Sequence, residues 1–240
     1  MYNKTIHTKR RDIAMNKRKT VFNILTIGII SIIAMYIMDS IINPGYIYKS
    51  LFKLTVFMLL PVIYTFMDKN IILLDLFKVK SKKQLILSIL LGLLVYIVIL
   101  GAYFILKNFI DLNNIKEILD RDLSVNKDNF VFVALYISFF NSLLEEFFFR
   151  GFIFLNLKKI IKGRNAYIIS AFAFAIYHVA IMSNWFSPAL FILAMTGLFI
   201  GGLIFNYLND RNSNIYGSWL VHMMANFAIN TVGFIMYGII

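Results

Sequence analysis

The stretch Phe130-Val-Phe-Val-Ala-Leu-Tyr-Ile-Ser-Phe-Phe-Asn141-Ser-Leu-Leu-Glu145-Glu146-Phe-Phe-Phe-Arg150-Gly151-Phe-Ile-Phe-Leu-Asn-Leu157 decides the fold, because it is long and apolar enough to cross a membrane. It nevertheless carries three charges, and one charge near the bilayer centre costs about 2.5–3.5 kcal/mol. Glu146 and Arg150 are four residues apart, so on a helix they lie one turn above each other and can neutralise one another. Glu145 is rotated by about 100° from Glu146, and we expect it to face a polar cavity. Alternatively, all three charges only hold helices together.

The composition indicates an all-α membrane protein. The 240 residues are 60% hydrophobic, with a mean hydropathy of +0.77, which predicts a polytopic membrane helical bundle forming one domain. Cysteine is absent, which excludes disulfides, thiolate nucleophiles and thiolate metal sites. The net charge of +12 comes mostly from the N-terminal tail and short loops. Membrane topology explains cations at such places, so we expect a lipid bilayer and no nucleic acid as the partner.

Apolar runs divide the chain into seven predicted transmembrane helices. The first lacks a small-residue cleavage site and is predicted to be a signal-anchor. Pro61 predicts a kink in the second, and Gly197, Gly201 and Gly202 favour close helix approach in the sixth. Short interfacial structure is expected in the basic connection 68–83 and in a helix within 107–129. The predicted spans are 21–42, 51–67, 84–106, 130–157, 166–182, 189–208 and 215–237.

These spans predict three parts: a basic cytoplasmic tail at 1–20, N-terminal transmembrane helices with a polar extracytoplasmic loop at 21–129, and a catalytic helical core at 130–240. With the tail in the cytoplasm, 17 of the 24 lysines and arginines fall on the cytoplasmic side and six on the other, among them Lys49 and Lys53. The remaining one, Arg150, lies in the membrane. The positive-inside rule therefore predicts a cytoplasmic N-terminus.

Two histidines lie inside predicted spans. A lone histidine on an apolar helix is more often a packed residue than a catalyst, but His178 and His222 accompany an unpaired glutamate. Asn226 follows His222 by four residues, so both side chains share one helix face. Glu145 and His178 are each about twelve residues, or roughly 18 Å, from the inner ends of their spans, so they can meet at one depth. His222 is nearer the inner face, which predicts a cavity that opens to the cytoplasm.

This set of residues suits amide hydrolysis without a covalent intermediate. A carboxylate beside a histidine can act as general base for water. A second histidine and an amide can donate hydrogen bonds to the oxyanion that forms on the peptide carbonyl. Other intramembrane protease chemistries fit less well. No deep pair of aspartates exists, since Asp39 is alone near the end of the first span. Neither a Gly-x-Ser-x-Gly nor a His-Glu-x-x-His motif is present.

The motifs Glu145-Glu146-x-x-x-Arg150, Phe174-x-x-x-His178 and His222-x-x-x-Asn226 resemble those of the CPBP family (CAAX protease and bacteriocin-processing, formerly Abi) of intramembrane endopeptidases. The resemblance covers about 130–237, and all the defining positions are present. It implies an all-helical core with a conical cavity open to the cytosol. It also implies that Glu145 and His178 activate water and that His222 and Asn226 form the oxyanion site, with Glu146, Arg150 and Phe174 supporting.

A metal is the open alternative within this resemblance. Glu145, His178 and His222 could supply the three ligands of a catalytic zinc site with an open fourth position. No further carboxylate is evident to orient the histidines, although a backbone carbonyl could do so. We therefore expect no metal cofactor, with zinc as the alternative.

The sequence predicts an intramembrane endopeptidase that cleaves a peptide or a membrane-associated protein. Eukaryotic members of the family trim prenylated CAAX tails. The abundance of Ile, Lys and Asn points to an AT-rich genome and a bacterial cell membrane, so a secreted peptide, a leader or a membrane protein is the expected substrate. The alternative is a non-proteolytic immunity or scaffolding protein of the same fold. A transporter is disfavoured because no inverted repeat is visible.

Overall fold

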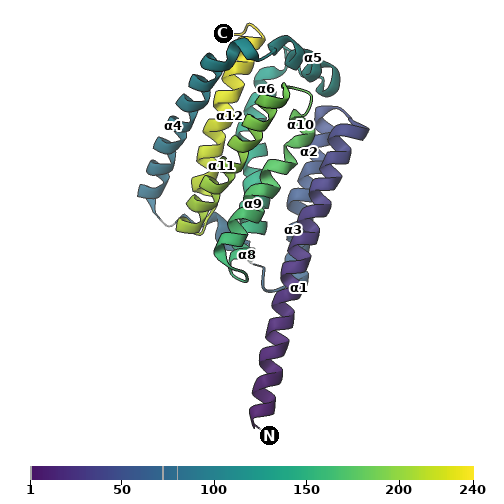
Figure 1. Cartoon of the computed structure of the whole chain (residues 1–240), viewed down its shortest axis with the longest axis vertical. Helices are drawn as coiled ribbons and strands as arrows, with labels where there is room; N and C mark the ends of the chain where they lie inside the picture. The colour runs from purple at the N-terminus through teal and green to yellow at the C-terminus, as the bar shows by residue number, and fades with distance from the viewer. Residues whose placement is uncertain (1, 72, 80) are drawn as a thin grey trace.

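The computed structural model describes residues 2–71, 73–79 and 81–240, and within these residues the chain is helical and contains no strand. This confirms the all-α class. Met1 of the tail and residues 72 and 80 of the connection 68–83 lie outside the described residues. The helices run side by side, and the N-terminal part of α1 projects from one end of the bundle (Figure 1).

Seven helical segments within the described residues are long and apolar enough to span a membrane, which confirms the predicted number. They are 15–42, 46–67, 82–109, 130–158, 163–182, 188–212 and 216–236. The helices are α1 (Tyr2–Ile37), α2 (Tyr46–Leu54), α3 (Leu60–Met67), α4 (Lys82–Leu106), α5 (Leu112–Leu123), α6 (Phe130–Tyr136), α7 (Ser142–Glu145), α8 (Leu155–Lys158), α9 (Gly163–Tyr177), α10 (Val179–Met182), α11 (Pro188–Asn212) and α12 (Tyr216–Met236). The expected short helix within 107–129 is α5.

One boundary differs in a way that matters for the site. The second span begins at Tyr46 rather than at 51. Lys49 and Lys53 therefore lie within the membrane helix α2, with 8% and 4% of their surface exposed. The prediction that both lie on the outer side is wrong. Lys49 precedes the predicted start of the span and Lys53 lies within 51–67, but hydropathy assigns a lysine to water unless its buried partner is known. A lysine can lie inside a span when a buried acid is there to pair with it.

The second and fourth spans are interrupted in ways that matter for the site. In the second, a π-helical turn at Thr55–Leu59 directly precedes Pro61, which stands in the first turn of α3, so the expected interruption lies at the proline. In the fourth, π-helical segments at Ile137–Asn141 and Glu146–Phe154 flank the single turn of α7. A π-helix turns less per residue than an α-helix, so the fourth span aims its side chains differently from the 100° spacing assumed above.

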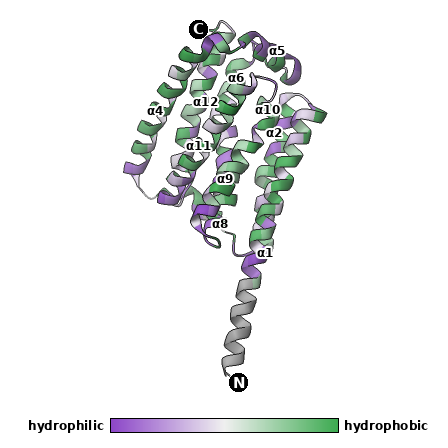
Figure 2. Ribbon diagram, in the orientation of Figure 1, coloured by the Kyte–Doolittle hydropathy of each residue, from purple (hydrophilic) through white to green (hydrophobic). Residues whose placement is uncertain are grey.

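The fourth span is also the centre of the core. Phe148, Phe149, Phe152 and Phe154 are fully buried, and Phe148 stacks on Phe57 of the second span with ring centroids 4.2 Å apart. The outer helices, by contrast, expose large apolar side chains along their length, as expected for a surface in contact with lipid. Figure 2 shows hydrophobic residues along most of α4 and α1 above its basic part. Burial thus decreases outward from the fourth span.

Of the three glycines in α11, only Gly202 serves close helix approach. A Cβ atom at Gly202 would lie 2.9 Å from the Cα of Ala171 in α9, whereas Gly197 and Gly201 have nothing within 4 Å. The prediction is confirmed for Gly202 and wrong for the other two.

Gly202→Ala should therefore destabilise the protein by about 1–3 kcal/mol, because the methyl group meets the backbone of α9. Gly201→Ala is the matched control, since the same change one residue earlier meets open space and gains helix propensity. Thermal unfolding in detergent compares the two. Equal stability of the two variants would contradict the close contact between α9 and α11.

Candidate active site

Glu145 ends the turn of α7 and is the point at which several spans meet. Its side chain is 2% exposed. Oε1 accepts hydrogen bonds from Lys53 Nζ at 2.5 Å and from Asn141 Nδ2 at 3.0 Å. Oε2 accepts none from the part of the chain that the structure describes, and it lies 3.8 Å from His178 Nε2 and 3.6 Å from His222 Nε2. One oxygen is thus held, and the other faces both histidines.

His178 stands at the break between α9 and α10. Its Nδ1 lies 2.8 Å from the carbonyl oxygen of Phe174, one turn earlier. Because a carbonyl oxygen can only accept, Nδ1 carries the hydrogen and, in the neutral imidazole, Nε2 presents its lone pair toward Glu145. The ring of Phe174 also packs edge-on against His178, with centroids 4.7 Å apart. Phe174 thus fixes both the tautomer and the orientation of this histidine.

His222 on α12 is oriented by a carboxylate. Its Nδ1 lies 2.9 Å from Glu146 Oε1, and its ring stacks on Phe205 with centroids 5.2 Å apart. The expectation that no further carboxylate orients a histidine is therefore wrong. Glu146 does so because the π-helical segment that starts at Glu146 lets consecutive glutamates reach two different sides of the same imidazole.

Glu146 and Arg150 form the expected internal pair. Both side chains have no exposed surface, and Arg150 Nη1 lies 3.1 Å from Glu146 Oε1. The guanidinium group also lies over the rings of Phe174, at 4.1 Å from the centroid, and Phe205, at 4.9 Å. Cation–π contacts of this kind stabilise a buried cation by about 2 kcal/mol. The pair and the two rings together hold Glu146 against His222.

Asn226 lies one turn from His222 but makes a different contact. Its Nδ2 donates to the carbonyl oxygen of Ile137 at 3.2 Å, and it makes no described hydrogen bond to Glu145 or to either histidine. A side-chain amide has a second N–H, which this bond leaves available. The structure therefore places Asn226 beside the fourth span, on the same helix face as His222.

Two residues of the site were missed by the sequence analysis. Lys53 was assigned to the outer side, and Asn141 was quoted without a role. Both carried a readable signal: Asn141 precedes Glu145 by four residues, and Lys53 follows another lysine by four on one face of α2. What could not be read was the partner, since Lys53 and Glu145 are 92 residues apart in sequence.

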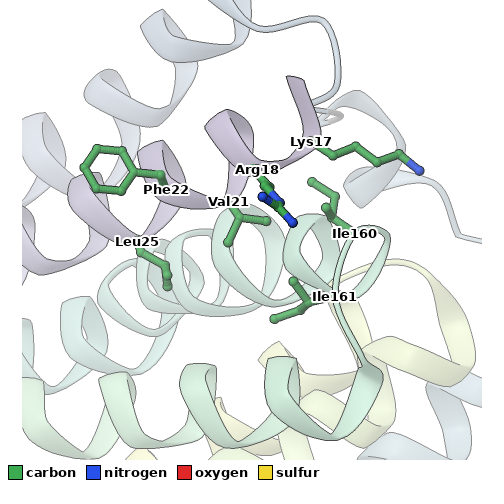
Figure 3. A pocket seen from close by; sticks show the side chains of 7 residues that line it. All are labelled: Lys17, Arg18, Val21, Phe22, Leu25, Ile160 and Ile161. Atoms are coloured by element: carbon green, nitrogen blue, oxygen red, sulfur yellow. The ribbon is translucent and has the colours of Figure 1, made fainter. Parts of the chain in front are cut away.

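The predicted cavity opening to the cytoplasm is not matched by a described pocket at Glu145. A groove of about 460 Å³ lies elsewhere, between α1 and the turn after α8, where Lys17 and Arg18 lie near Ile160 and Ile161 (Figure 3). Its lining contains neither an acid nor a histidine, so it is not the catalytic centre. At the site itself His178 is the most exposed of the paired side chains, at 15% against 7% for His222.

The side chains present do not fit zinc as they stand. Ligands of a tetrahedral zinc ion are about 3.3–3.4 Å apart, given bonds of about 2.0–2.1 Å, whereas Glu145 Oε2 is 3.6 and 3.8 Å from the two Nε2 atoms. Among the described residues, no three acidic or histidine side chains meet the spacing for a metal ion. The Lys53 ammonium on the same carboxylate would also repel a divalent cation.

Comparison with known proteins identifies the second half of the chain. Residues 127–228 match the model of a family described as Rce1-like, type II CAAX prenyl endopeptidase. The matched segment contains Glu145, His178, His222 and Asn226 but not Lys53. No curated protein and no solved structure matches the chain.

Arg150→Met should destabilise the protein by about 3–5 kcal/mol, because it leaves the Glu146 carboxylate buried without its cation. Removing both charges in Glu146→Gln/Arg150→Met should recover most of that loss. Lys78→Met is the control, since it breaks an exposed pair with Asp75 worth less than about 1 kcal/mol. Unfolding in detergent measures all three, and an Arg150→Met variant as stable as the Lys78→Met variant would refute the buried pair.

Proposed function

We propose that this chain, a membrane protease with a Rce1-like domain at residues 127–228, hydrolyses a peptide bond of a peptide or membrane-associated protein through water activated by Glu145 and His178. The observation that supports this assignment is the convergence of Glu145 Oε2 on the Nε2 atoms of two histidines, at 3.8 and 3.6 Å. These separations are too long for direct hydrogen bonds, and a water that sits over the three atoms could contact all of them.

In the proposed first step, water donates one proton to Glu145 Oε2 and is held by the lone pair of His178 Nε2. Its oxygen attacks the carbonyl carbon of the scissile bond, and the carbonyl π electrons move to the oxygen, giving a tetrahedral oxyanion. Collapse of this intermediate breaks the C–N bond while Glu145 returns the proton to the leaving nitrogen. The carboxylate is thereby regenerated, and no covalent enzyme intermediate forms.

We propose that His222 and Asn226 stabilise the oxyanion. His222 lies between two carboxylates, Glu146 at 2.9 Å and Glu145 at 3.6 Å, so as an imidazolium it can donate from both ring nitrogens. Asn226 has one N–H beyond the bond to Ile137. Donors aimed at a developing oxyanion in a site that excludes water typically contribute factors of about 10²–10³ to the rate.

The proposed substrate is reached from the membrane, with the N-terminus of the enzyme in the cytoplasm of a bacterial cell. The orientation is supported by the positive-inside asymmetry of the predicted spans. The proposed substrate class is broad: a secreted peptide, a leader or a membrane protein. The aromatic and aliphatic side chains around the site do not select a particular peptide sequence.

Glu145→Gln and His178→Ala should each lower kcat/KM by at least about a hundredfold, since each removes one partner of the attacking water. Peptides that are released by cells expressing the wild type, but not by cells expressing Glu145→Gln, identify a substrate. A fluorogenic peptide with that sequence is then used to measure kcat/KM of the purified proteins. Glu117→Gln, an exposed change on α5, is the control for expression and detergent handling. Full cleavage by both site variants would refute the role of Glu145 and His178 in activating water. A wild type that releases no peptide would favour the non-proteolytic role.

We further propose that the reaction needs no metal. Dialysis against EDTA and 1,10-phenanthroline should then leave cleavage unchanged within twofold, because Lys53 already provides the cation beside Glu145. Added zinc should not stimulate. Loss of activity on chelation that zinc restores would reverse this proposal and make Glu145, His178 and His222 the ligands.

A further inference from the structure

Helix α2 carries two buried lysines whose partners differ. Lys49 lies near the outer end of the span, where its Nζ is 2.7 Å from Asn43 Oδ1 and 3.8 Å from Asp39 Oδ1. Lys53, one turn deeper, reaches the active site instead. Neither residue lies in the segment that matches the protease family.

The contacts of Lys53 are those of a fixed cation. Its Nζ donates to Glu145 Oε1 and to Asn141 Oδ1, each at 2.5 Å. The same ammonium lies 4.8 Å from the ring centroid of Tyr177 and 5.4 Å from that of Phe57. With 5% of the side chain exposed, Lys53 is held between two polar acceptors and two aromatic faces.

Because of these contacts, the two oxygens of Glu145 have different surroundings. Oε1 accepts from both Lys53 and Asn141, whereas Oε2, buried and without a hydrogen bond from any described residue, faces the histidines. If Lys53 were absent, the carboxylate could rotate about its last bond and would have no opposite charge of its own. Arg150 cannot replace Lys53, because it is paired with Glu146.

The charges of the site also balance through Lys53. Glu146 is matched by Arg150 and Glu145 by Lys53, so the two acids and the two cations together carry no net charge. A buried charge that loses its partner is strongly unfavourable. Lys53 thus keeps Glu145 ionised in the membrane at no net charge, which is the state that a general base requires.

We propose that Lys53 is a positioning residue of the protease: it anchors Glu145 by Oε1 and so directs Oε2 toward the water that His178 and His222 surround. This inference rests on the proposed function, and it deepens it by adding a residue from the N-terminal half of the chain. Lys53 bonds Oε1, whereas Oε2 faces the histidines, so in the proposed reaction Lys53 does not touch the reacting atoms.

The role predicts a loss in kcat with little change in KM. Lys53→Met keeps an unbranched side chain and removes the ammonium group, so kcat should fall by about a hundredfold while KM stays within threefold. Lys49→Met is the matched control, because it removes a buried lysine from the same helix, one turn away, without touching Glu145. It should retain the wild-type kcat.

Absence of cysteine from the chain allows a sharper test. In Lys53→Cys, a methanethiosulfonate that carries an ethylammonium group rebuilds a cationic side chain at position 53 alone, and mass spectrometry verifies the modification. This should raise kcat at least tenfold over unmodified Lys53→Cys, and dithiothreitol should reverse the gain. The neutral methyl methanethiosulfonate adds bulk without charge and should not restore activity.

The outcomes separate the two proposals. Wild-type kcat in Lys53→Met, with Glu145→Gln inactive, overturns the role of Lys53 and leaves the protease assignment standing. Wild-type cleavage by Glu145→Gln overturns the proposed role of Glu145 in activating water, and with it the role of Lys53 that rests on it. If Lys53→Met fails to fold while Lys53→Met/Glu145→Gln folds, the lysine is confirmed as the partner of that carboxylate. If both fail to fold, Lys53 is a structural residue only and the proposal is wrong.

Discussion

Two ion pairs inside the membrane, Glu146 with Arg150 and Glu145 with Lys53, are the constraint on which the structure depends. An unpaired charge is strongly unfavourable in an apolar medium, so each of the two acids requires its own cation. The first pair closes within one helix. The second pair forms only when α2 packs against the fourth span. The Lys53–Glu145 pair therefore also joins the N-terminal half of the chain to the segment that matches the family.

The π-helical segments of the fourth span let the side chains of the adjacent residues Glu145 and Glu146 point in different directions. Glu145 ends the turn of α7 and Glu146 begins the longer π-helical segment, so one carboxylate faces the Nε2 atoms and the other reaches Nδ1 of His222. Segments of this kind occur often at functional sites because they re-aim side chains without ending the helix. Here they let two neighbouring acids serve one histidine from opposite sides.

An aromatic shell completes the centre. The ring of Phe174 touches Arg150 and both histidines, and its backbone carbonyl sets the tautomer of His178. Phe205 stacks on His222 and also lies under the guanidinium group. Such a shell lowers the local dielectric, which strengthens the electrostatic interactions inside it. The aromatic residues are therefore part of the electrostatics of the site and not only of its packing.

The sequence by itself determined the membrane class, the number of spans, the Glu146–Arg150 pair and the candidate acid and histidines, because hydropathy and four-residue spacing are local properties that do not require knowledge of partners. It did not determine the role of Lys53, the orientation of His222 by Glu146 or the use of Gly202 alone among three glycines. Each of these depends on which helices are neighbours and on where a helix becomes π-helical. Only the tertiary structure decides such contacts, since the residues involved are far apart in the chain. A buried charge without a partner is unfavourable, and so is a side chain that collides with a neighbouring backbone, so the packing of the helices selects which residues meet.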